Sequence, residues 1–162
     1  MPIVADEGCP ISANSCEQYW ADFCRALGIP PDAPHRVRRL GDDPATCRLL
    51  LDLIRTGQKT GTFALAEEFA AAGETSPVAG EYLVLTDFEG RPDCVVRLTE
   101  VKAKPFSLVM ADDVACEGPG LRDLRAWREL HWAYWGRKLE RLGGTPDLGM
   151  AVLCQRFELQ KE

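Results

Sequence analysis

The stretch GQKTGTF, from Gly57 to Phe63, places a lysine amine and two threonine hydroxyls between two glycines. Acyl transfer needs a nucleophile, a group that moves its proton and a donor to the developing oxyanion, and amines and hydroxyls can fill such roles. The alternative is structural, because a lysine often follows a glycine that ends a helix and a threonine often opens a strand. The residue types alone leave both interpretations open.

Two groups of arginines could contact phosphate. The groups are Arg36, Arg38 and Arg39, in HRVRRL, and Arg122, Arg125 and Arg128, at three-residue intervals. The second spacing places its arginines near one face of a predicted helix. Acidic residues at positions 123 and 129 lie within pairing distance, which favours a solvated, ion-paired face over a binding surface.

The composition limits the classes of protein. The 162 residues suffice for one domain, and the apolar share of 46% and charged share of 27% exclude disordered, collagen-like and coiled-coil classes. A net charge of −6 argues against a protein that coats long nucleic acid, but it allows a small pocket for one nucleotide. No apolar run could cross a bilayer and no signal-peptide pattern is present, so we expect a cytoplasmic protein without a membrane partner.

The seven cysteines form an odd, scattered set without a C-x-x-C pair or a histidine at zinc spacing. We therefore expect reduced thiols that fill core positions, with no disulfide framework, metal site or cofactor. The sequence does not specify the oligomeric state. The cysteines are Cys9, Cys16, Cys24, Cys47, Cys94, Cys116 and Cys154.

Two helices are predicted in the first third of the chain. Residues 15–27 carry apolar side chains at helical spacing, with Ser15 as the expected N-cap, and the apolar face should pack on the domain. A second helix is expected to start after Asp43 as N-cap and to run to residue 56, where Gly57 would end it in a left-handed conformation.

The rest of the chain mixes strands with one long helix. A hairpin is expected over residues 82–101, a helix over 121–142, and a last strand over 150–160 that returns to pair with the hairpin. Residues 63–74 are alanine-rich and predict a helical turn or short helix, and a short strand is expected around Val37. These elements predict an α+β fold on a small, mainly antiparallel sheet.

Five motifs occur in a fixed order over three quarters of the chain: LIRTGQKTGTF, GEYLVLTDFEGRPDCVVRLTEV, a phenylalanine ahead of ACEGPG, LRAWRELHWAYW and AVLCQRFEL. With these motifs, the segment from Gly41 to the end resembles the ASCH domain family. The resemblance implies a PUA-like fold, a small β-barrel with flanking helices and a cleft associated with RNA or nucleoside ligands. We expect residues 41–162 to form this domain, and residues 1–40 to add an amino-terminal helix and loop that pack on it in one compact domain.

The resemblance also implies site residues. The family's glycine-x-lysine-x-x-threonine pattern falls on Gly57, Lys59 and Thr62, and its glutamate-glycine pattern begins at Glu117. In members that resemble this chain, an amidohydrolase acting on 4-acetylcytidine is known, and the residues at the places of Lys59, Thr62 and Glu117 are its proposed catalytic residues. Gly57, with Arg128 and His131 of the tryptophan-arginine-x-x-histidine pattern, is expected to bind the ligand. Arg38 and Arg39 are also expected to bind it, as arginines of HRVRRL that could contact phosphate rather than as part of the family pattern.

The chain departs from the family pattern at two positions. Asp123 stands where longer members commonly carry a serine, which puts a role for that hydroxyl, including a ribonuclease role, in doubt. Pro119 stands where the motif often has a second glutamate, so one carboxylate and one possible metal ligand are lost.

The roles of the three proposed catalytic residues depend on local geometry. Lys59 and Thr62 would share a face in a helical turn and would point apart in an extended loop, and Gly61 allows either. A nearby Glu117 would favour a charged Lys59 that orients the substrate or binds an oxyanion, unless burial outweighs it. Our hypothesis is that Thr62 attacks or positions a water, Lys59 activates or polarises, and Glu117 handles the proton of the leaving amine.

Whether the protein is an enzyme stays open at this point; if it is, an amidohydrolase is the first hypothesis and a metal-dependent ribonuclease acting on single-stranded RNA the second. The ribonuclease would have only two acidic pairs as ligands, residues 42–43 and 112–113. A third hypothesis is a non-catalytic RNA-binding module, and a fourth is a protein-interaction domain that docks its partner through the first helix. His131 could also be simply a hydrogen-bonded, partly buried histidine.

Overall fold

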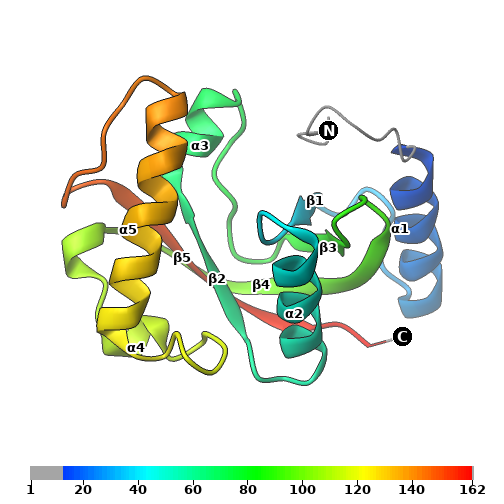
Figure 1. Cartoon of the computed structure of the whole chain (residues 1–162). Coiled ribbons are helices and arrows are strands. Elements are labelled where there is room, and N and C mark those ends of the chain that lie inside the picture. Colours follow the sequence, from blue (N-terminus) through cyan, green and yellow to red (C-terminus); the bar gives the residue numbers. More distant parts are fainter. Residues whose placement is uncertain (1–12, 162) are drawn as a thin grey trace. The chain divides into compact units, whose positions relative to one another are not determined.

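The computed structural model describes residues 13–161. Within this range the chain divides into two compact units, each built from segments that are distant in sequence. Figure 1 shows the elements in chain order. Unit 1 holds residues 13–57, 79–99 and 157–161, and unit 2 holds residues 58–78 and 100–156.

Five strands form a mixed sheet with the order β1-β3-β4-β5-β2. The pairs β3 with β4 and β2 with β5 are antiparallel, whereas β1 runs parallel to β3. The predicted hairpin is therefore confirmed, and the last strand does lie beside it. The strands are β1 (His35–Arg39), β2 (Gly61–Leu65), β3 (Tyr82–Thr86), β4 (Pro92–Pro105) and β5 (Ala151–Leu159).

Helical segments alternate with these strands. The two long predicted helices that follow residue 40 are confirmed, and the short strand around Val37 is β1. The helices are α1 (Ala13–Leu27), α2 (Pro44–Arg55), α3 (Ala66–Ala71), the 3-10 turn η1 (Phe106–Leu108), α4 (Ala111–Val114) and α5 (Leu124–Arg141).

In unit 1, α1 packs its apolar face on β3 and β4. Trp20 and Phe23 are buried in a cluster with Val84 and Val95, as the amphipathic pattern predicts. The same packing removes the motive for a partner-docking role of this helix. The predicted N-cap at Ser15 is wrong, because α1 already includes Ala13 and Asn14 and Ser15 lies inside the helix.

The start and end of α2 follow the prediction. The Asp43 carboxylate accepts a hydrogen bond from the Thr46 amide at 2.8 Å, which is the N-cap arrangement. After the helix, Gly57 has a φ of 75°, a conformation that favours glycine, and its amide donates to the carbonyl of Ile54. The structural role expected for Gly57 is therefore confirmed.

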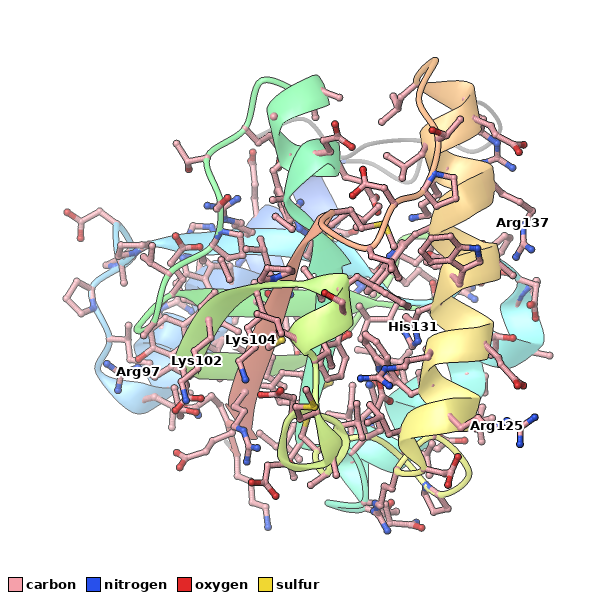
Figure 2. The ribbon with its side chains drawn as sticks, turned by 90° about the vertical axis from the view of Figure 1, so that its left-hand side faces the viewer. Arg97, Lys102, Lys104, Arg125, His131 and Arg137 are labelled. Atoms are coloured by element: carbon pink, nitrogen blue, oxygen red, sulfur yellow. The ribbon has the colours of Figure 1, made fainter. Side chains whose placement is uncertain are left out.

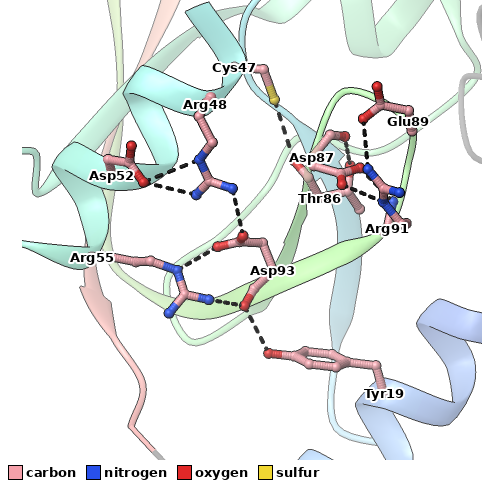
Figure 3. Close-up of polar contacts among 10 residues, drawn as sticks. All are labelled: Tyr19, Cys47, Arg48, Asp52, Arg55, Thr86, Asp87, Glu89, Arg91 and Asp93. Atoms are coloured by element: carbon pink, nitrogen blue, oxygen red, sulfur yellow. Dashed lines mark hydrogen bonds and ion pairs between the residues drawn. The ribbon is translucent and has the colours of Figure 1, made fainter. Parts of the chain in front are cut away.

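A polar network around Asp93 ties α2 and α1 to the start of β4 (Figure 3). The Asp93 carboxylate accepts hydrogen bonds from Arg55 Nε at 2.6 Å and from Arg48 Nη1 at 3.2 Å. Its backbone carbonyl accepts from Arg55 Nη2 and from the Tyr19 hydroxyl. One aspartate therefore fixes two helices of unit 1 to the same strand end.

In unit 2, α5 covers one face of β2 and β5. Trp127 and Trp135 of α5 are fully buried against Leu65 of β2 and Val152 of β5. The prediction of a helical turn from residue 63 is wrong for its first residues, because β2 extends through Leu65 before α3 begins. Pairing of β2 with β5 outweighs the helical preference of the alanine-rich segment.

The six cysteines of the described range are buried and unpaired, which confirms their predicted role as packing residues; Cys9 lies outside that range. Burial raises the pKa of the Cys94 and Cys154 thiols to about 11. Thiols of this kind are weak nucleophiles. Among the described residues, no helix has the length and apolar character needed to span a membrane.

The N-cap of α5 gives a stability prediction. Asp123 accepts a hydrogen bond from the Ala126 amide at 2.9 Å, and serine and aspartate cap helices about equally well. We expect Asp123→Ala to lower the free energy of unfolding by about 1 kcal/mol and Asp123→Ser to change it by only a few tenths. Urea denaturation measures both. Equal losses in the two variants would contradict a capping role.

Candidate active site

Lys59 and Glu117 form a buried ion pair. Lys59 Nζ lies 2.9 Å from Glu117 Oε2, and the two side chains are only 3% and 4% exposed. Removing two charges from water costs several kcal/mol per ion, so each of these side chains depends on the other in the interior. The structure thus brings together two of the three proposed catalytic residues.

Backbone contacts hold the two segments that carry this pair. The Thr60 amide donates a hydrogen bond to the Cys116 carbonyl at 2.8 Å. Arg122 then bridges the same segments, because its Nε donates to the Glu117 carbonyl at 2.7 Å and its Nη2 to the Gln58 carbonyl at 2.6 Å. Arg122 therefore positions the backbone on both sides of the ion pair.

The three arginines expected on one helix face have three different environments. Arg122 precedes α5 and bridges the segments described above. Arg125 is exposed and pairs with Glu129, as expected for a solvated face. Arg128 donates from Nη2 to the Val109 carbonyl at 2.9 Å, and its buried Nε has no hydrogen-bond partner within the described residues. The three-residue spacing did not distinguish these roles, because Asp123 starts the helix after Arg122.

Gly61 is the position where the segments approach most closely. A Cβ atom added there would lie 2.4 Å from the Gln155 carbonyl oxygen and 2.6 Å from Cys116 Sγ. Side chains do not tolerate such distances, so only glycine lets the Cys116 segment lie against β2 and β5. Glu117 reaches Lys59 because of this approach.

His131 lies on the side of α5 that faces the core of unit 2, whereas Arg125 and Arg137 extend from the helix into solvent (Figure 2). Its ring stacks on Trp127 at 4.2 Å between centroids, and its Nδ1 lies 2.8 Å from the Trp127 carbonyl. Because a carbonyl only accepts, Nδ1 carries the proton in this contact. In a neutral ring Nε2 is then a hydrogen-bond acceptor.

Burial lowers the pKa of His131 below its ordinary value. The hydrogen bond to the Trp127 carbonyl and the charge of Glu117 act in the opposite direction, and the charge of Lys59 adds to the lowering. Both members of the ion pair therefore influence the pKa of His131. His131 is hydrogen-bonded and buried, which matches one of the two interpretations drawn from the sequence. Its role in ligand binding stays a prediction.

The side chain of Thr62 lies on the face of β2 that is directed away from α5. It is paired with Gln155, while the next pair, Phe63 and Cys154, packs toward Trp127 of α5. Since side chains alternate along a strand, Thr62 points away from α5. Within residues 13–161 its side chain makes no hydrogen bond, so its catalytic role stays a prediction.

The remaining predicted ligand-binding residues belong to unit 1. Gly57 ends α2, and Arg38 Nη1 donates to the Val37 carbonyl at 3.2 Å. Arg39 donates to the Phe88 carbonyl and lies 4.5 Å above the Phe88 ring. Arg36, considered with them as a phosphate contact, is 5% exposed and ion-paired with Glu81 at 2.7 Å. Its guanidinium is therefore not presented to solvent.

The acidic pairs are largely engaged. Asp43 caps α2, and Asp113 binds Lys104 Nζ at 2.8 Å and accepts from the Met110 amide. Across the part of the chain that the structure describes, no group of three or more histidine, cysteine or acidic residues is arranged to hold a metal ion.

A substitution at Gly61 tests the close approach. We expect Gly61→Ala to lower the free energy of unfolding by about 1–3 kcal/mol, because the new methyl group overlaps a backbone oxygen of β5. Gly136→Ala in α5 is the control, since its Cβ would meet only Pro146, at an ordinary 3.5 Å. The control should be neutral or stabilising by up to about 1 kcal/mol. Chemical denaturation compares the two, and a neutral Gly61→Ala would refute the close approach.

His131 predicts a pH dependence of stability. Its pKa is lower in the folded chain, so below the unfolded value the unfolded chain binds more protons and the free energy of unfolding decreases. We expect this loss as pH falls from about 7.5 to about 5.5, and we expect His131→Gln to reduce it. The control is His35→Gln, at the only other histidine, which should keep it. Denaturation midpoints across this range measure the effect; an unchanged slope in His131→Gln would contradict it.

Comparison with known proteins identifies similar chains. The family model of the ASCH domain matches residues 38–161. The crystal structure of an ASCH domain from Lactobacillus crispatus JV V101 is 25% identical with a TM-score of 0.75, covering 90% of this chain and 91% of that one. Protein EF3133 from Enterococcus faecalis V583 is 25% identical with a TM-score of 0.82, covering 92% and 90%. A search of curated proteins found no match. The predicted α+β fold class and family resemblance are confirmed.

Proposed function

This chain belongs to the ASCH domain family, and on that premise we propose that it hydrolyses the amide bond of 4-acetylcytidine-type nucleosides. Its fold is PUA-like, an architecture often linked to RNA binding. The observation that carries the proposal is the buried ion pair of Lys59 and Glu117. Both residues stand at positions that the family resemblance marks as catalytic.

A buried ion pair contributes little net stability to a fold, because the cost of desolvating both charges offsets their attraction. Apolar residues of similar volume often stabilise a fold equally well or better, so such a pair is weak support for a purely structural role. Lysine and glutamate together supply what amide hydrolysis needs, a cation that stabilises an oxyanion and a carboxylate that moves a proton. A low-dielectric surrounding strengthens both effects.

The proposed reaction uses water as the nucleophile. Glu117 accepts a proton from the water as its oxygen bonds to the acyl carbon, and the Lys59 ammonium stabilises the negative charge on the former carbonyl oxygen. Glu117 then passes the proton to N4 of the cytosine as the carbon–nitrogen bond breaks. The products are a carboxylic acid, which ionises, and the free nucleoside.

We assign Thr62 to binding rather than attack. A threonine hydroxyl needs an adjacent base to become nucleophilic, and within the described residues no side chain is hydrogen-bonded to it. The extended conformation of β2 also directs it away from the α5 side of the strand. A hydroxyl in this position can donate to, or accept from, a polar ligand.

The rival hypotheses have less support from these residues. A metal-dependent ribonuclease would rely on acidic pairs of which Asp43 and Asp113 are already engaged. An RNA-binding module would rely on basic side chains that include Arg36, and this guanidinium is buried with Glu81.

We also propose that the protein resides in the cytoplasm, as the sequence analysis predicts.

Incubation with 4-acetylcytidine, followed by chromatography of released cytidine, tests the function. We expect turnover that a chelator does not abolish. Lys59→Ala and Glu117→Gln should each lower kcat/KM at least about 100-fold, since each loses a transition-state interaction. Arg125→Ala, at an exposed helix position, is the control and should keep full activity.

Single-stranded RNA, with and without chelator, is assayed in parallel. Melting temperatures of the variants separate lost chemistry from lost folding. Undiminished hydrolysis by Lys59→Ala would refute the assigned site. Chelator-sensitive degradation of RNA, without release of cytidine from the nucleoside, would favour the ribonuclease.

A further inference from the structure

The backbone that carries the ion pair of Lys59 and Glu117 belongs to two connecting segments. Lys59 lies between the end of α2 and the first residue of β2, and Glu117 lies in the connection of residues 115–123 between α4 and α5. Connecting segments are held less firmly than helices and strands, because fewer backbone hydrogen bonds fix them. The position of each charged side chain therefore depends on the contacts that join the two segments.

Arg122 makes such contacts with both segments at once. Its Nε donates to the Glu117 carbonyl at 2.7 Å, and its Nη2 donates to the Gln58 carbonyl at 2.6 Å. One carbonyl belongs to a member of the ion pair, and the other belongs to the residue just before Lys59. The two nitrogens are part of one planar guanidinium, so a rigid group sets the spacing of the two carbonyls. We call this pair of hydrogen bonds the Arg122 clamp.

The charge of Arg122 is not neutralised by a carboxylate. Within residues 13–161 its guanidinium forms no ion pair, and the residue is exposed. Holding a long, exposed side chain in one conformation costs entropy, and hydrogen bonds from a charged donor are strong enough to offset that cost. The contacts of Arg122 therefore serve the geometry of the backbone around the ion pair.

We propose that Arg122 is a positioning residue, which keeps Lys59 and Glu117 at the spacing that hydrolysis requires. It acts through the backbone and does not touch the reacting atoms. This inference rests on the proposed function for the identity of the reaction, and it adds a residue that the family pattern does not include. A displacement of about 1 Å can lower a catalysed rate about 100-fold, so loss of the clamp should lower kcat.

Amide hydrogen exchange, followed by NMR, tests the clamp directly. The Thr60 amide donates to the Cys116 carbonyl at 2.8 Å, so its exchange rate reports whether the two segments stay together. We expect Arg122→Ala and Arg122→Lys to raise this rate about ten-fold or more, because a lysine ammonium cannot set the spacing of two carbonyls as a planar guanidinium does. Amides in the pairing of β2 with β5 should exchange as in the wild type, and the melting temperature should change little.

Hydrolysis of 4-acetylcytidine tests the consequence for catalysis. We expect both substitutions to lower kcat about ten- to one-hundred-fold with little change in KM, since a displaced catalytic group weakens the transition state more than substrate binding. Arg125→Ala and Arg125→Lys are the matched controls, because the Arg125 side chain is 88% exposed and pairs with Glu129. Both controls should keep the wild-type kcat and the wild-type exchange rate at Thr60.

The two measurements separate this inference from the proposed function. Wild-type protein that hydrolyses nothing refutes the hydrolase; faster exchange at Thr60 in the Arg122 variants then still supports the clamp, and unchanged exchange overturns it. Faster exchange with an unchanged kcat overturns the positioning role. A rise in kcat/KM also overturns it, because Arg122 would then be a barrier to the ligand.

Two further outcomes would contradict the clamp. Full activity of Arg122→Lys beside a defective Arg122→Ala would assign the effect to charge and not to the planar fork. Equal loss of protection at Thr60 and throughout β2 and β5, with a lower melting temperature, would assign it to general stability.

Discussion

The candidate site depends on how closely the backbone at Cys116 approaches the start of β2. Gly61 has no side chain, so Cys116 packs against it and accepts a hydrogen bond from the neighbouring Thr60 amide. That contact determines where Glu117 emerges, and the 2.9 Å ion pair with Lys59 follows from it. Arg122 then connects the carbonyls on both sides. The absence of a side chain at Gly61 is therefore what allows the other contacts of the site to form.

The electrostatics of the site follow from burial. Lys59 and Glu117 retain only a few per cent of their exposure, so each depends on the other's charge, and removing one would leave an uncompensated ion in the interior. The same surroundings lower the pKa of His131, which therefore favours a neutral ring with its proton on Nδ1. Unit 2 thus combines one cation, one anion and one neutral acceptor among aromatic side chains. This combination suits a reaction in which charge develops and disappears without exchange with bulk water.

Local signals in the sequence predicted much of the fold but only part of the site. Asp43 and Gly57 delimit α2 as expected, because capping depends on neighbouring residues alone. The family pattern marked Lys59 and Glu117, although no periodicity relates residues separated by 58 positions. The bridging role of Arg122 was not recognised, since it comes from tertiary contacts with two segments that are distant in sequence. The strand at residues 61–65 was missed for the same reason: its pairing with β5 is non-local.

The departure at Asp123 helps to separate structural from chemical roles within the family pattern. Aspartate at this position caps α5 through the Ala126 amide, a contact that the more common serine can also make. The exchange therefore preserves helix geometry, and with it the placement of Trp127 and His131, without requiring a reactive hydroxyl. The proposed chemistry is then concentrated at the start of β2, where Lys59 precedes the strand and Thr62 lies three positions later, within it. Because side chains alternate along β2, Phe63 packs toward Trp127 on the α5 side while Thr62 points to the opposite face, so adjacent residues of this strand serve the core and the solvent side separately.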